Sequence, residues 1–216
     1  MDDRETGDAG SAVAARDRSP ELLAAVVLAG GAGRRLGGVD KPAIMVGGRP
    51  LLGSVVEAAV LAGAGRIVVV GPARPGFPVV SFTSEEPAGG GPVPALRAGL
   101  ALVSEPVMLL LAGDLPFLDA GVLRGLAASA RDGTGDGAVL VDDSGRAQWL
   151  ASCWGTAGLR AALESYSGDS LRGLLSSLNY AELAPAPEAG APPWWLDCDT
   201  PEDLAAARSL ADPDRP

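Results

Sequence analysis

Short, largely apolar runs alternate with helix-like stretches through the first half of the chain. Residues 24–28, 66–70 and 107–111 are typical of strands that are buried on both faces of a parallel sheet, and the last of these predicts the central strand. Shorter extended pieces are expected at 44–46 and 79–82, and helices at 51–61, at 94–103 and from an Asp119 cap to about residue 130. Strands and helices in alternation predict a right-handed, mostly parallel sheet.

A hairpin interrupts this alternation in the second half of the chain. Residues 138–141 and 148–153 flank the turn Asp142-Asp143-Ser144-Gly145, which is typical of two antiparallel strands. Helices are expected at 157–164, at 170–178 and, after a Thr200 cap, at 201–210; strands are expected at 180–183 and 194–198. The fold class that follows is α/β: a Rossmann-like three-layer sandwich with a mostly parallel sheet and one antiparallel insertion.

The length of the chain suits one domain. Its 216 residues allow a single α/β unit with a substantial core, expected at 21–210. Residues 1–20 are polar and acidic and lack an apolar signal core, so a disordered tail and a cytoplasmic location are expected. Residues 211–216 are expected to form a frayed end.

Charge and composition exclude several classes of function. The net charge is −10, which disfavours general nucleic-acid binding, and the absence of histidine excludes Ser-His-Asp hydrolysis and histidine-based zinc sites. No stretch approaches the roughly 20 apolar residues of a membrane span. Cys153 and Cys198 lie far apart in strand-like runs, which predicts two buried apolar side chains rather than a disulfide or a redox pair.

A loop rich in glycine and positive charge follows the first predicted strand. Residues 28–42 read LAGGAGRRLGGVDKP, with five glycines within nine residues. Glycine lets the backbone turn tightly and turn its N–H groups toward a ligand. Arg34, Arg35 and Lys41 add three cations that a plain turn does not need. Strand, glycines and cations together predict a cradle for a polyphosphate.

Two familiar phosphate-binding motifs do not fit this loop. A dinucleotide fingerprint needs a third glycine, but Gly31-Ala32-Gly33 is followed by two arginines and a leucine. That fold also needs an acidic residue after the second strand, where this chain has Gly71. A P-loop needs Gly before its lysine and Ser or Thr after it, whereas Lys41 stands between Asp40 and Pro42.

Acidic residues follow two other predicted strands. Asp114 comes directly after the central strand, and Asp197 and Asp199 lie at the end of the last one, on the same side if that strand is regular. Ligands of open α/β sheets bind at the carboxyl ends of strands, and Mg²⁺ prefers one or two carboxylates plus phosphate oxygens. Asp114 and Asp199 also have a structural alternative, as caps of the helices that follow them.

Residues 28–41 resemble the signature L-A-G-G-x-x-x-R-x-G-G-x-D-K of the molybdenum cofactor guanylyltransferases, which are similar to the sugar-nucleotide transferases. The pair Gly30-Gly31 is typical of the guanylyl branch, whereas cytidylyl enzymes more often carry Ala-Gly. The resemblance covers roughly 24–210. It includes Gly113-Asp114-x-Pro116, similar to the family's metal motif, and 199–204, similar to its N-T-P-E-D-L with Asp199 in place of Asn.

The resemblance implies Mg²⁺-dependent transfer of GMP from GTP to the phosphate of molybdenum-molybdopterin, with release of pyrophosphate. It implies that Lys41, Arg35 and Asp114 are catalytic, and that Asp114 with Asp199 or Asp197 binds the metal. The nucleotide contacts that it implies are Leu28, Ala29, Gly30, Gly31, Gly33, Arg34, Arg35, Lys41, Gly71, Glu86, Gly91 and Asp114. Gly71 stands where the family usually has Asn.

Base and acceptor recognition are implied by shorter matches. Glu86, before a glycine-rich loop, is expected to accept hydrogen bonds from guanine N1 and N2; the alternative is an exposed loop glutamate. Gln148 in Gln-Trp-Leu resembles the family's Q-P-L, and Arg172 in Ser-Leu-Arg resembles its S-L-R, so both are expected to touch a molybdopterin-type acceptor. Trp149 and Trp154 are expected either to contact this acceptor or to pack in the core.

Two other functions remain open at this stage. One is a related transferase that uses CTP, or a phospholactate- or phosphoenolpyruvate-type acceptor. The other is an inactive nucleotide-binding partner protein, which the intact Lys41, Asp114 and Asp199 argue against. The expected partners are GTP, the pterin acceptor and molybdoenzyme-maturation proteins, with neither nucleic acid nor membrane among them.

Overall fold

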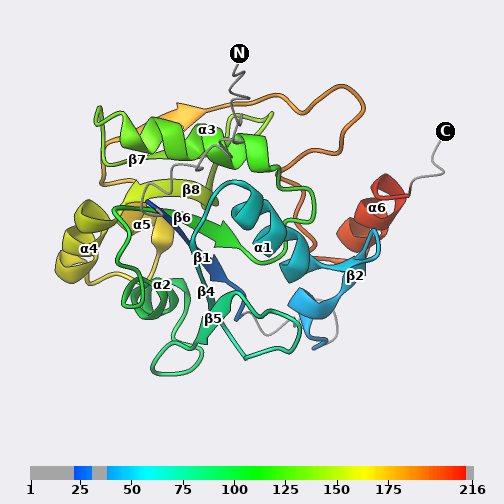
Figure 1. Cartoon of the computed structure of the whole chain (residues 1–216), viewed down its shortest axis with the longest axis horizontal. Helices are drawn as coiled ribbons and strands as arrows, with labels where there is room; N and C mark the ends of the chain where they lie inside the picture. The colour runs from blue at the N-terminus through cyan, green and yellow to red at the C-terminus, as the bar shows by residue number, and fades with distance from the viewer. Residues whose placement is uncertain (1–21, 31–37, 213–216) are drawn as a thin grey trace, which may run out of the picture.

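The computed structural model describes residues 22–30 and 38–212, and within them a seven-stranded sheet forms the centre of the molecule (Figure 1). Its spatial order is β5-β4-β1-β6-β8-β7-β9, and a separate two-stranded sheet pairs β2 with β3. The strands are β1 Leu23–Leu28, β2 Met45–Val46, β3 Arg49–Pro50, β4 Arg66–Val70, β5 Val80–Thr83, β6 Val107–Ala112, β7 Gly137–Val141, β8 Ala147–Gly155 and β9 Tyr180–Leu183.

The large sheet is parallel except at one strand. β1 runs parallel to β4 and β6, β4 to β5, and β7 to β9, whereas β8 is antiparallel to both of its neighbours. The run at 107–111 becomes β6, the fourth of the seven strands. These pairings confirm the mostly parallel sheet with one antiparallel insertion, and the central place of β6.

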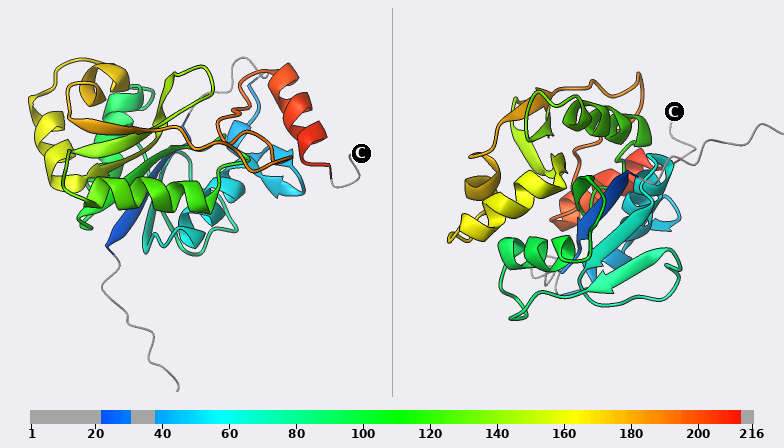
Figure 2. Two further views of the ribbon diagram at one scale, coloured as in Figure 1. Left: turned by 90° about the horizontal axis from the view of Figure 1, so that it is seen from above. Right: turned by 60° about the vertical axis from the view of Figure 1, so that its left-hand side comes forward.

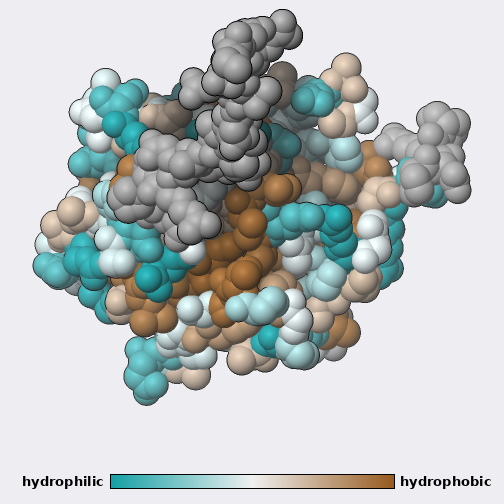
Figure 3. Space-filling view, viewed as in Figure 1, coloured by the Kyte–Doolittle hydropathy of each residue, from teal (hydrophilic) through white to brown (hydrophobic). Residues whose placement is uncertain are grey.

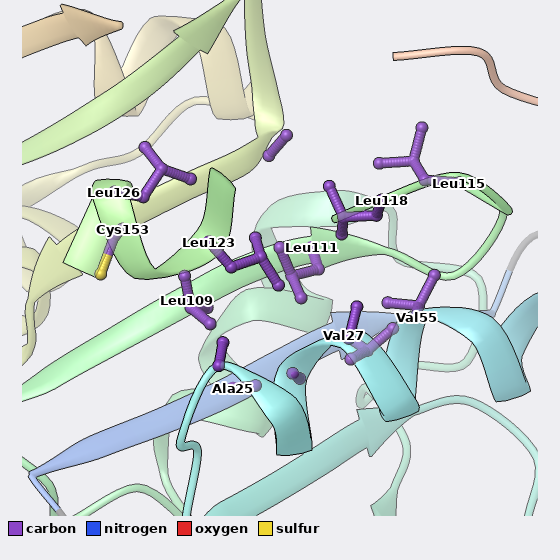
Figure 4. Packing of buried hydrophobic residues seen from close by; sticks show 14 of the residues in the cluster. Ala25, Val27, Val55, Leu109, Leu111, Leu115, Leu118, Leu123, Leu126 and Cys153 are labelled. Atoms are coloured by element: carbon purple, nitrogen blue, oxygen red, sulfur yellow. The ribbon is translucent and has the colours of Figure 1, made fainter. Parts of the chain in front are cut away.

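Helices cover both faces of the sheet, which makes three layers (Figure 2). On one face, α1 Leu51–Leu61 and α3 Ala120–Arg131 pack Val55, Leu123 and Leu126 against Val27 and Leu109 of the strands (Figure 4). On the other face, α2 Pro92–Leu100, α4 Thr156–Ser165 and α5 Leu171–Leu175 cover Val26, Val68 and Leu110. Strands that are buried on both faces explain the continuous apolar runs of the sequence.

A small third cluster attaches the end of the described chain. Ala207 of helix α6 Pro201–Leu210 and Cys198, which precedes this helix, are buried against Val46 of β2 and Leu51 of α1. In Figure 1, α6 lies beside β2, far from β9. Burial raises the pKa of both Cys153 and Cys198 to about 12, and both are free, as the sequence predicts.

One expected strand is absent from the described chain. Residues 194–198 pair with none of its strands; instead, Leu196 N–H closes a turn onto the carbonyl of Pro193 at 3.2 Å. The indole of Trp194 is buried and donates to the carbonyl of Pro185 at 3.0 Å, and its ring meets Trp195 edge to face. Side-chain anchoring by the two tryptophans therefore replaces ladder pairing, and the prediction of a strand was wrong. The helix expected at 170–178 is also shorter, since α5 ends at Leu175.

Two apolar side chains at the carboxyl end of α1 stay exposed. Val60 and Leu61 are 45% and 62% exposed, and Figure 3 shows apolar residues gathered near the centre of the face where Figure 1 places α1. None of the helices in the described ranges combines the length and apolar character that crossing a bilayer requires. The predicted tail at 1–20 lies outside the described residues, as does 213–216 of the frayed end predicted at 211–216; Ala211 is the C-cap of α6.

We expect Leu110→Ala to destabilise the protein strongly. Leu110 is 0% exposed in the central strand, so truncation leaves a cavity and should cost about 2–5 kcal/mol of unfolding free energy. Leu102→Ala is the matched control, because Leu102 is 44% exposed and its truncation should cost under about 0.5 kcal/mol. Urea unfolding followed by circular dichroism measures both; equal losses would contradict the described core.

Candidate active site

The backbones of three neighbouring strands stay joined for one residue beyond their carboxyl ends. Ala29 N–H donates to the carbonyl of Val70 at 2.9 Å, and Gly113 N–H donates to the carbonyl of Leu28 at 3.0 Å. The loops that follow β1, β4 and β6 therefore begin side by side. The predicted contacts Leu28, at the end of β1, and Ala29, Gly30, Gly71 and Asp114, in these loops, are therefore brought together by the sheet.

Close backbone approach explains why position 71 is glycine. Gly71 has φ +152°, and a Cβ built on it would lie 2.8 Å from the carbonyl oxygen of Ala29. On the other side of Ala29, a Cβ on Gly113 would lie 3.0 Å from the Ala29 Cβ. An asparagine at position 71 would need the backbone to move, so Gly71 can contribute only main-chain groups.

Lys41 links three distant segments of the chain. It opens the short 3-10 helix η2 Lys41–Ala43, and its Nζ donates to the carboxylate of Asp114 and, at 2.5 Å, to Oδ1 of Asp199. The partners lie 73 and 158 residues further along the sequence. The lysine side chain is 13% exposed, against 21% for Asp114 and 44% for Asp199. A buried cation is thus matched by two carboxylates.

The charges at this centre shift one another's pKa values. Burial opposes the charged form of Lys41, but the carboxylates of Asp114 and Asp199 outweigh it and hold the lysine pKa above its ordinary value. Asp197 has an exposed surface, yet partial desolvation by the surrounding protein, with the charges of Asp199 and Asp114, raises the pKa of its carboxyl group. Lys41 is therefore an ammonium at neutral pH.

The helix caps are supplied by other residues. Asp119 Oδ1 accepts from the N–H groups of Gly121 and Val122 at the start of α3. Thr200 and Asp203 form a capping box at the start of α6. The capping alternatives for Asp114 and Asp199 are thus wrong, and neither residue opens a helix.

Arg74 fixes the residue before Lys41. Its Nη2 and Nε donate to the two carboxylate oxygens of Asp40 at 2.5 and 3.1 Å, and its Nη1 donates to the carbonyl of Pro72 at 2.8 Å. The hydrogen bond from Arg74 lowers the pKa of Asp40. A bidentate pair of this kind ties the end of the glycine-rich loop to the loop between β4 and β5.

The structure brings Glu85, rather than the predicted Glu86, to the first loop. A Cβ on Gly30 would lie 3.7 Å from Glu85 Oε2, and Glu85 Oε1 accepts from Gly89 N–H at 3.0 Å. Glu86 is exposed. Gly91 is the N-cap of α2, with φ +95°. The predicted residues Gly31, Gly33, Arg34 and Arg35 lie outside the described residues.

A cavity of about 430 Å³ extends from the carboxylates toward the hairpin. Asp114, Asp197 and Asp199 line one part of it, and both predicted acceptor residues, Gln148 and Arg172, line another. Arg146, which the sequence did not single out, also lines the cavity, as does Trp195, for which the sequence favours a packing role over a platform for a ring. The predicted metal ligands and the predicted acceptor residues therefore share one cavity.

An irregularity in β8 shapes this cavity. Val139 pairs with Ser152 but the next residue, Leu140, pairs with Gln148, so residues 149–151 bulge between β7 and β8. Trp149 consequently lines the cavity, whereas Trp154 is fully buried and donates to Ser152 Oγ. Bulges commonly redirect side chains next to active sites.

Asp114 and Asp199 offer oxygen ligands of the kind that Mg²⁺ binds. In the described ranges, no three His, Cys, Asp or Glu side chains form a metal site by themselves. Mg²⁺ does not need such a cage, because it commonly takes one or two carboxylates plus substrate phosphates. The ammonium of Lys41 stands in for a cation between Asp114 and Asp199, so this pair can hold positive charge at one point.

Nucleotidyl transfer requires carboxylates for a metal, a cation for phosphates and room for an acceptor beside them. The family model of the MobA-like NTP transferase domain matches residues 25–184. The chain therefore belongs to the MobA-like NTP transferases, a family of nucleotidyltransferases.

Individual relatives agree over most of the chain. A molybdenum cofactor guanylyltransferase of Rhodopseudomonas palustris is 33% identical, over 89% of this chain and 94% of the relative. The solved structure of molybdopterin-guanine dinucleotide biosynthesis protein A from Archaeoglobus fulgidus has a TM-score of 0.66 at 20% identity, covering 86% and 97%. A nucleotidyl transferase from Methanothermobacter has a TM-score of 0.69 at 22% identity, covering 88% and 97%.

Gly71→Ala should destabilise the protein by about 1–3 kcal/mol, because its Cβ would collide with the Ala29 carbonyl at a strained φ. Gly125→Ala is the control: nothing lies within 4 Å of the new Cβ in α3, so stability should rise by about 0.5–1 kcal/mol. Thermal unfolding of both variants measures the difference. A neutral Gly71→Ala would contradict the close approach of these loops.

Proposed function

We propose that the protein transfers GMP from GTP to the phosphate of a molybdenum-molybdopterin acceptor, using Mg²⁺ and releasing pyrophosphate. The observation that carries the proposal is that Asp114 and Asp199, the two carboxylates bonded to Lys41, line one cavity with Gln148 and Arg172. The names of the curated relatives support the base and the acceptor.

The reaction is an in-line displacement at the α-phosphorus of GTP. An oxygen of the acceptor phosphate forms the new P–O bond while the bond to the β-phosphate oxygen breaks, and pyrophosphate leaves. Lys41 binds the phosphates and stabilises the charge that develops on the α-phosphoryl group. Asp114 and Asp199 would hold Mg²⁺, which when bound neutralises phosphate charge.

Glu85 is proposed as the group that reads guanine. Guanine presents two adjacent donors, N1–H and N2–H₂, which one carboxylate can accept together. Glu85 lies next to Gly30 at the end of β1, whereas the neighbouring Glu86 is exposed. Of the two adjacent glutamates, Glu85 is therefore the one that lies close enough to the loop to contact a base there.

The acceptor is proposed to bind between the hairpin and α5. Arg146 and Arg172 line this part of the cavity and supply positive charge for its phosphate. Trp149 and Trp195 offer aromatic surface to a flat pterin. The Gln148 amide donates to Asp142 Oδ2 at 2.6 Å, and this hydrogen bond fixes the orientation of the Gln148 side chain.

Asp114→Asn should lower turnover by at least about 100-fold, because the amide cannot carry the charge that metal binding and Lys41 require. Asp132→Asn, on an exposed turn after α3, is the matched control and should keep the wild-type rate. Pyrophosphate release with GTP, Mg²⁺ and molybdenum-molybdopterin measures both. A wild-type rate in Asp114→Asn would rule out its proposed role.

Glu85→Gln should weaken GTP binding by about tenfold or more, because charged hydrogen bonds typically contribute 1.5–3 kcal/mol. Glu86→Gln is the adjacent control and should bind GTP within about twofold of wild type. Calorimetric titration with GTP, and with CTP as the competing base, measures the effect. Loss of GTP preference in Glu86→Gln alone would reverse the assignment.

A further inference from the structure

The ammonium of Lys41 occupies the place where the proposed reaction needs a metal ion. It bonds to both carboxylates proposed to hold Mg²⁺, and its side chain is only 13% exposed. Lys41 is also the only lysine of the 216-residue sequence. The proposed function requires Lys41 to bind the phosphates of GTP, whereas in the structure the same ammonium bonds to Asp114 and Asp199. One side chain cannot do both at once.

An ammonium and a divalent ion cannot share this position. Both are compact, strongly hydrated charges, and their repulsion is large where the site is partly shielded from water. If a metal is to contact Asp114 and Asp199, Nζ must leave them and still find a counter-charge, because an unpaired buried ammonium is costly. A triphosphate supplies that counter-charge.

The surroundings of Lys41 favour movement of the side chain over movement of the backbone. Asp40, the preceding residue, is held by the two hydrogen bonds from Arg74, and the following Pro42 is buried. The lysine side chain has a flexible stem of four carbons, so Nζ can move while η2 stays in place.

Building on the proposed function, we propose that Lys41 is an internal counter-ion that closes the metal position in the nucleotide-free protein. When a nucleoside triphosphate binds, Nζ transfers from Asp114 and Asp199 to the phosphates, and these two carboxylates bind the divalent ion in place of the ammonium. Metal binding thus requires the nucleotide, although the carboxylates are already assembled. A purely structural ion pair would instead keep Lys41 on the carboxylates in every state.

The first test is metal binding without nucleotide. Mn²⁺ titrations followed by electron paramagnetic resonance compare wild type with Lys41→Met, which keeps the apolar stem and removes the charge. We expect Lys41→Met to bind Mn²⁺ at least about tenfold more tightly, as typical coupling factors allow. Arg66→Met is the matched control: it removes one charge from the Glu105 pair at the amino end of β4, and should bind Mn²⁺ as wild type does.

The second test follows Lys41 itself and does not depend on a variant. Because the sequence has one lysine, ¹⁵N-lysine labelling gives a single side-chain ammonium signal. We expect Mg²⁺ alone to leave that signal unchanged and GTP in the presence of EDTA to shift it. Tryptophan fluorescence reports separately whether GTP binds.

The outcomes separate this proposal from the proposed function. The counter-ion role is overturned if wild type and Lys41→Met bind Mn²⁺ equally, or if bound GTP leaves the ammonium signal in place. If Lys41→Met does not fold, the labelled wild-type protein decides. If GTP does not bind at all, the proposed function fails, and the Mn²⁺ comparison still judges the role of Lys41.

Discussion

The ion pair of Lys41 with Asp114 and Asp199 is the contact on which the rest of the site depends. It joins the end of the glycine-rich loop, the end of the central strand and the segment before α6, which are far apart in sequence. Partly buried charges are stable only when paired, so these segments hold one another in place. The same charges are those that a triphosphate and a magnesium ion would exchange.

The sheet makes this contact possible. Parallel strands β4, β1 and β6 end at one edge, and glycines at 71 and 113 let their backbones close on Ala29. The third side of the site comes from outside the large sheet: burial of Cys198 and Ala207 against β2 and α1 fixes α6, and with it Asp199. Close approach of the strand backbones thus positions Asp114, and the small apolar cluster positions Asp199.

Local patterns predicted most elements because those elements bury apolar runs. The strands β4 and β9, helix α1 and the caps Asp119 and Thr200 are confirmed at the expected positions, and the hairpin strands within two residues of their expected bounds. Tertiary contacts decided the rest. The tryptophan anchors turned residues 194–198 into a turn, the bulge at 149–151 separated the roles of Trp149 and Trp154, and long-range packing placed Glu85 beside Gly30. No periodicity in the sequence encodes these outcomes.

A crystal structure with GTP and Mg²⁺ tests the central claim most directly, because it locates the nucleotide and the cation at once. The account predicts the triphosphate at the carboxyl ends of β1, β4 and β6, with the metal on Asp114 and Asp199 and Lys41 Nζ on phosphate oxygen. A nucleotide bound elsewhere, with Lys41 still paired to both aspartates, would contradict it.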